Sequence, residues 1–121
     1  MSIQGMSRRF EQGISVKFLI YETLKTLNTD DVFEFGLGEI SKPVDDEAFY
    51  QAELVFVRNG KSTKRTVSHM SEFAVLTSFL THVGIKLRSI AKDDSIEFEL
   101  HGLTFDQYIP LTKKIRDTFD E

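Results

Sequence analysis

Residues 54–65 read Leu-Val-Phe-Val-Arg-Asn-Gly-Lys-Ser-Thr-Lys-Arg, and this stretch decides the fold. Asn59-Gly60 lies between two runs of strand-forming residues and predicts a β-hairpin, because a type I′ turn needs positive φ at both central residues. The hairpin strands are expected at 48–58 and 61–68. A two-residue turn also fixes the register. The predicted pairs are Arg58 with Lys61, Val57 with Ser62, Phe56 with Thr63, Val55 with Lys64 and Leu54 with Arg65.

Upstream of the hairpin, the spacing of apolar residues predicts a helix and a strand. Apolar residues that recur every three or four positions are typical of one face of an amphipathic helix, and this pattern predicts a helix at 14–28. Over 32–40, large apolar residues alternate strictly with glutamate and glycine, which predicts a strand with one buried face. Gly36 and Gly38 on its other face indicate a bulge or a close approach by another group. The helical stripe consists of Val16, Leu19, Ile20, Leu24 and Leu27.

Downstream of the hairpin we expect a second helix, a second hairpin and a third helix. The second helix is expected at 71–83, with Ser68 or Ser71 as N-cap and Gly84 directly after its end. Two strands, at 85–91 and 95–101, then flank a polar turn, with Ile96, Phe98 and Leu100 pointing inward. The third helix is expected to begin at Pro110, after a short turn at 104–108. Its apolar stripe is Leu111, Ile115 and Phe119.

These elements predict one α+β domain over residues 1–121, with 1–12 as a flexible arm. The expected order is α-β-β-β-α-β-β-α. Because hairpins join the strands, we expect a mostly antiparallel five-stranded sheet with helices packed on one face.

The composition excludes several classes of protein. The chain has 121 residues, a net charge of −4 and no cysteine. Disulfides, thiol catalysis and cysteine-based zinc sites are therefore excluded. Neither a secretory signal nor an apolar run long enough to span a bilayer is visible, so we expect a cytoplasmic protein that does not enter membranes. The acidic balance counts mildly against a dedicated nucleic-acid binder.

No motif for catalysis or for binding a cofactor or metal withstands inspection. Gly60-Lys61-Ser62 resembles the end of a phosphate-binding loop, but position 55 is valine where that motif needs glycine, and the context is strand-turn-strand. Glu97, Glu99 and His101 share one strand face, where three side chains about 7 Å apart converge poorly on a metal. We therefore expect no enzyme activity and no cofactor.

The basic hairpin is the best candidate binding site. Within eight residues it carries four cations and no acid, and two arginines near the N-terminus could add to it. Three interpretations remain open: the cations protect a sheet edge from pairing, they contact nucleic acid, or they bind an acidic protein. The candidate residues are Arg58, Lys61, Lys64, Arg65, Arg8 and Arg9.

The predicted element order over 14–120, in a chain of this length and acidic balance, is similar to that of the small dimeric chaperones of type III secretion. That resemblance is topological and carries over no functional residue. It implies a protein that holds a partner segment, with a homodimer as its expected assembly. We therefore expect a small non-catalytic protein-binding module: an accessory factor, an inhibitor or a chaperone-like protein. The alternative is a nucleic-acid-binding protein that uses hairpin 58–65 and the N-terminal arginines.

Overall fold

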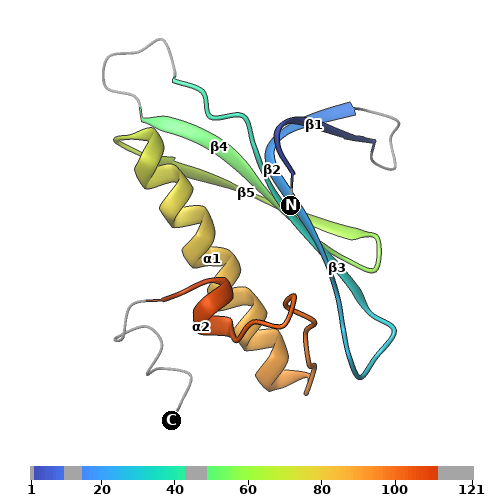
Figure 1. The fold of residues 1–121 in the computed structure, drawn as a ribbon. Helices are drawn as coiled ribbons and strands as arrows, with labels where there is room; N and C mark the ends of the chain where they lie inside the picture. The colour runs from blue at the N-terminus through green and yellow to red at the C-terminus, as the bar shows by residue number, and fades with distance from the viewer. Residues whose placement is uncertain (1, 10–14, 43–48, 112–121) are drawn as a thin grey trace.

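The computed structural model describes residues 2–9, 15–42 and 49–111, with side chains from residue 17 onward. All neighbouring strands are antiparallel, and they follow one another across the sheet in chain order (Figure 1). The elements are β1 (Ser2–Arg9), β2 (Ser15–Lys25), β3 (Val32–Gly38), β4 (Tyr50–Arg58), β5 (Lys61–His69), α1 (Glu72–Asp93) and α2 (Phe105–Tyr108).

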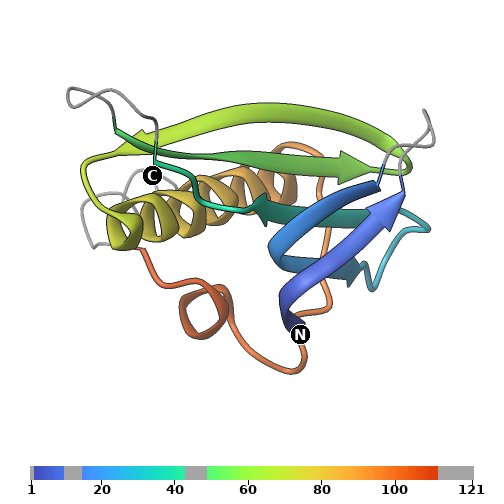
Figure 2. The same cartoon turned by 90° about the horizontal axis from the view of Figure 1, so that it is seen from above.

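The molecule has an α+β architecture in which α1 covers one face of an antiparallel sheet. Strands β2–β5 form the four-stranded body of this sheet, and β1 pairs with the outer side of β2. Figure 2 shows β5 at the free edge of the sheet, and α2 on the opposite side of α1 from β5. In the described part of the chain, no helix is long and apolar enough to cross a membrane.

The main core lies between α1 and the sheet. Helix α1 begins after Ser71, whose side chain accepts a hydrogen bond from the backbone N–H of Ala74. Helix α1 runs nearest β4 and β5, and the ring of its Phe79 reaches across to within 6.2 Å of the Phe35 ring on β3. The buried stripe of α1 consists of Val75, Phe79, Val83 and Leu87. The sheet and the segment after α1 supply Leu24, Phe33, Phe35, Leu37, Ala52, Leu54, Phe56, Val67, Ile96, Phe98, Leu100 and Ile109.

The Asn59-Gly60 hairpin is confirmed in turn and in register. Asn59 and Gly60 both have positive φ, at 51° and 84°, as a type I′ turn requires. All five predicted strand pairs occur between β4 and β5. The side chain of Asn59 also accepts a hydrogen bond from the backbone N–H of Val32, which attaches the turn to the start of β3.

The predicted order α-β-β-β-α-β-β-α is wrong, first because the described part of the helix expected at 14–28, residues 15–28, is not helical. They contain strand β2, which is buried on both faces: Leu24 belongs to the main core, whereas Phe18 and Tyr21 belong to a second cluster on the far face. A register irregularity between Phe18 and Ile20 interrupts the alternation. Two-sided burial with such an interruption leaves apolar residues three and four apart, which imitates a helical stripe.

The predicted helix end at 83 and the strand predicted at 85–91 are also wrong, because α1 continues to Asp93 and includes that strand. Gly84 does not end the helix. A Cβ at this position would lie 2.9 Å from Cγ2 of Ile109 and 3.0 Å from Cδ2 of Leu111, so glycine is needed where the chain after α2 crosses α1. Arg88 holds this crossing, since it donates hydrogen bonds to the backbone oxygen of Ile109 and to Asp106.

Residues 95–101 form no named strand, although Ile96, Phe98 and Leu100 are buried as expected. They lie along the end of β2 through a single bridge between Thr26 and Phe98. The turn expected at 104–108 is the short helix α2, with a complete capping box between Thr104 and Gln107. The helix expected from Pro110 falls mainly on residues 112–121, outside the described residues, and Pro110 and Leu111 belong to no helix.

The element order therefore removes the basis of the resemblance to type III secretion chaperones. Five strands precede both described helices. The stretch considered as a flexible arm contains strand β1.

Gly36 is explained by the second cluster, on the sheet face away from α1. This cluster comprises Phe18, Tyr21, Val55 and Val57. A Cβ on Gly36 would lie 2.6 Å from Cδ2 of Tyr21, 3.0 Å from a ring carbon of Phe18 and 3.0 Å from the backbone oxygen of Ile20. The close approach indicated by the sequence is therefore made by the protein's own β2.

We predict that Gly36→Ala lowers the free energy of unfolding by roughly 1–3 kcal/mol, because buried rings and a backbone oxygen must move. Gly38→Ala is the matched control, since its nearest contact would be an ordinary 3.6 Å to the backbone oxygen of Glu53. We expect the control to change stability by less than about 0.5 kcal/mol. Urea unfolding of both variants measures the difference, and equal stabilities would contradict this packing.

Candidate functional site

A groove of about 490 Å³ lies between α1 and the sheet at the β5 edge. Its apolar floor comes from β4 and α1, and its polar wall comes from β5 and the outer side of α1. A volume of this size is typical of ligand sites. The groove is lined by Leu54, Phe56, Thr63, Lys64, Arg65, His82, Val83, Ile85, Lys86 and Ser89.

A second hollow of about 300 Å³ extends this groove towards the hairpin turn. The two share Phe56, Thr63 and Lys86, so they form one continuous surface along the helix-facing side of β5. The second hollow adds Arg58, Lys61 and Ile90. We call the combined surface the β5–α1 groove.

The β5–α1 groove is cationic, and none of the described residues that line it is acidic. Lys61, Lys64, Arg65 and Lys86 have no carboxylate within salt-bridge distance among the residues whose side chains are described. Lys86 lies with its Nζ 5.5 Å from the centre of the Phe56 ring, which holds its charge above the apolar floor. A cluster of unpaired cations in a chain of net charge −4 is a local reversal of the overall charge.

Arg58 differs from the other hairpin cations because it is engaged within the protein. It forms ion pairs with Asp94 at 2.7 Å and with Asp31 at 3.7 Å. Its guanidinium also lies 5.1 Å from the centre of the Phe33 ring. A hydrogen bond from Asn59, another from Thr29 and the charge of Arg58 lower the pKa of Asp31. Arg58 therefore joins the hairpin to the end of α1 and is less available to a ligand.

His82 titrates in the electrostatic field of the groove. Partial burial lowers its pKa from the usual value, and the nearby Arg65 and His69 lower it further. All of these effects favour the neutral form of the imidazole. A carboxylate bound beside Arg65 would reverse part of this effect.

The structure brings some of the predicted site residues together and separates others. Lys61 and Arg65 share the helix-facing side of β5, whereas Lys64 pairs with Val55 and lies at the rim. Arg8 and Arg9 lie on β1, at the other end of the strand order from β5.

Sequence reasoning missed Lys86 and the position of His82. The signal existed, because His82 and Lys86 are four residues apart and occupy one helix face if the helix continues past Gly84. The predicted helix end at 83 concealed it.

A second polar cluster involves His101 and Glu99, which were weighed above as metal ligands. Tyr108 donates a hydrogen bond to Glu22, and His101 lies 3.8 Å from the same carboxylate. Burial and then the charge of Glu22 raise the pKa of Tyr108. No group of three metal-binding side chains occurs within the described part of the chain. The cluster attaches the segment after α1 to β2.

A scan against models of protein families found no match, and searches of curated proteins and of solved structures found none either.

We predict that Arg65→Gln raises the pKa of His82, because it removes the second cause of the depression. The pKa should stay below the usual histidine value, since burial is the larger cause and is unchanged. NMR titration of the imidazole proton measures this. Lys64→Gln is the control and should leave the pKa in place. An unchanged His82 pKa in Arg65→Gln would show that the two side chains are not neighbours in solution.

Proposed function

We propose that this protein is a non-catalytic protein-binding module that holds an acidic segment of another protein in the β5–α1 groove. The observation that carries this proposal is a set of four cations around an apolar floor that have no ion-pair partner among the described side chains, in a chain that is acidic overall. Carboxylates of a partner would supply the counter-charges that the described side chains do not.

The chemistry of the groove supports a polypeptide ligand because it combines two kinds of surface. Lys61, Arg65 and Lys86 offer charge-assisted hydrogen bonds to carboxylates. Between them, the half-buried Ile85 and the exposed margins of Leu54 and Phe56 provide apolar contact area. A segment that carries both acidic and apolar side chains satisfies both surfaces, and their complementarity would determine which partner binds.

Nucleic acid remains the second candidate, since phosphates also bind lysine and arginine. The apolar floor distinguishes the two, because backbone phosphates make no use of it. The separation of Arg8 and Arg9 from β5 in the strand order also weakens the original nucleic-acid proposal, which combined them with the hairpin.

We predict that an acetylated and amidated octapeptide of four Glu-Val repeats binds, and that the equivalent Lys-Val peptide does not. Calorimetry at low salt measures both affinities. The double variant Arg65→Glu, Lys86→Glu should weaken Glu-Val binding by at least about tenfold, because close charge pairs are reversed. Raising the salt concentration should weaken wild-type binding as well.

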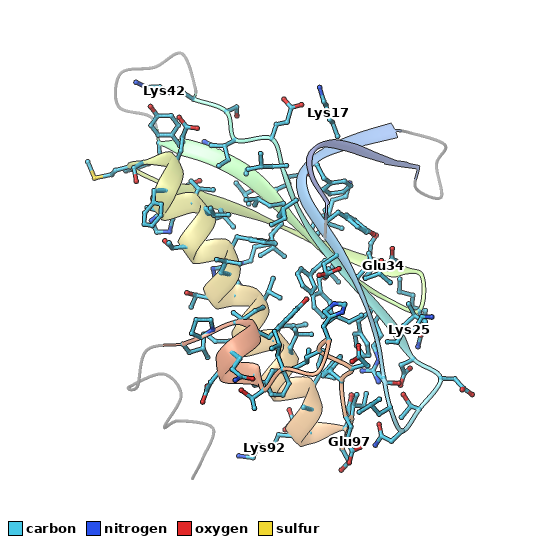
Figure 3. All side chains as sticks on the ribbon, in the orientation of Figure 1. Lys17, Lys25, Glu34, Lys42, Lys92 and Glu97 are labelled. Atoms are coloured by element: carbon cyan, nitrogen blue, oxygen red, sulfur yellow. The ribbon has the colours of Figure 1, made fainter. Side chains whose placement is uncertain are left out.

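Lys25→Glu is the matched control, since Lys25 is exposed on β2 and Figure 3 places it well away from α1. It should bind as the wild type does. No binding of Glu-Val, equal binding of Lys-Val, or equal loss in the control would contradict the proposal. If a single-stranded or duplex oligonucleotide at equal concentration displaces the bound peptide, the groove is a nucleic-acid-binding site instead.

A further inference from the structure

Strand β5 presents an unpaired edge along the whole groove. It is the last strand in the sheet order, and within the described residues it pairs only with β4. Val67 is the single buried residue of Lys61–His69. In Figure 2, β5 follows the outer margin of the sheet beside α1. An edge of this kind carries free backbone N–H and C=O groups.

The register identifies which backbone groups are free. In a two-residue hairpin the pair that flanks the turn is hydrogen bonded, here Arg58 with Lys61, and bonded pairs alternate with non-bonded pairs along the strands. Every second residue from Lys61 therefore bonds to β4, and the residues between them direct N–H and C=O outward. These outward residues are Ser62, Lys64, Thr66 and Ser68.

Charge decides what can pair with this edge. A second copy of the chain would bring Lys64 and its neighbours against the same cations, which is unfavourable. An acidic strand would instead place its row of carboxylates beside cations, next to Arg65 and Lys86 if the row faces the helix or next to Lys64 if it faces the other side. The same cations that oppose self-pairing thus favour an acidic occupant.

We propose that the partner segment binds as an added sixth strand, with backbone hydrogen bonds to the outward groups of Ser62, Lys64, Thr66 and Ser68. This inference rests on the proposed function and specifies its mode, which is strand addition rather than helix docking. From Ser62 to Ser68 the edge spans about 20 Å at roughly 3.3 Å per residue, so the bound core of the ligand is about seven residues long.

The side chains of an added strand alternate between two environments. Those on the helix-facing side meet His82, Ile85 and Lys86 of α1, and those on the other side meet the rim at Lys64. A bound segment therefore buries one row of side chains in the groove and leaves the other row near the surface. An α-helix in the same position would have no free backbone groups to offer to the edge, because its own are paired.

Amide hydrogen exchange followed by NMR, with and without saturating Glu-Val octapeptide, tests this mode directly. The N–H groups of Ser62, Lys64, Thr66 and Ser68 should exchange at least about tenfold more slowly in the complex, since each gains a hydrogen bond. The N–H groups of Thr63 and Arg65, already bonded to β4, should change much less. Uniform protection along β5, or none, would overturn strand addition.

A proline variant provides the second test. Thr66→Pro removes an outward N–H without removing a bond to β4, and proline is tolerated at such edge positions. We expect it to weaken Glu-Val binding by about tenfold or more, through a lost bond and a steric obstacle to the added strand. Thr66→Val keeps the N–H and should bind within about twofold of the wild type. Equal affinities for the two variants would contradict the proposed mode.

The outcomes separate this inference from the proposed function. If Arg65→Glu, Lys86→Glu abolishes binding while the alternating protection is missing, the groove binds acidic segments but not as a strand. If the peptide does not bind at all, both proposals fail. Because the exchange pattern is measured on the unaltered protein, a Thr66→Pro chain that does not fold leaves the first test decisive.

Discussion

The packing of α1 on one face of the sheet is the constraint on which the rest of the structure depends. The backbone of α1 runs nearest β4 and β5, and the ring of Phe79 reaches Phe35 on β3. The two flanks of α1 differ in what covers them. One flank receives the segment after α2, because Gly84 admits Ile109 and Leu111 and because Arg88 bonds to the backbone there. The other flank faces β5, where only Val67 is buried, and it remains open as the groove. The described part of the chain therefore covers α1 on one side, and the groove lies on the other.

Local chemistry determined the parts of the fold that were predictable from the sequence. The Asn59-Gly60 turn specifies its own backbone geometry, so the register of β4 and β5 was predicted pair by pair. Tertiary packing determined the parts that were not. Strand β2 is buried on both faces with a register irregularity near Phe18, which no single period describes. Gly84 has the position of a helix stop, but it is required by the side chain of Ile109, a contact 25 residues away in the chain.

For the same reason, only part of the candidate site could be predicted from the sequence. Hairpin register correctly divided Lys64 from Arg65 between two faces, but it could not show that α1 brings Lys86 to the same side as Arg65. It also could not show that Arg58 is engaged by Asp31 and Asp94, which come from distant turns. A cluster of like charges in a sequence contains both structural and available cations, and only the positions of distant carboxylates separate them.

A chain with a net charge of −4 can still bind an acidic ligand, because a bound ligand interacts mainly with the charges nearest to it. At physiological salt, exposed charges more than about 8 Å apart are largely screened. A carboxylate within the β5–α1 groove thus interacts mainly with Lys61, Arg65 and Lys86, and only weakly with the acids elsewhere on the surface. The overall charge acts during approach, where it slows the encounter of two acidic chains. Selectivity then depends on contact within the groove, so a segment must match its cations and its apolar floor together.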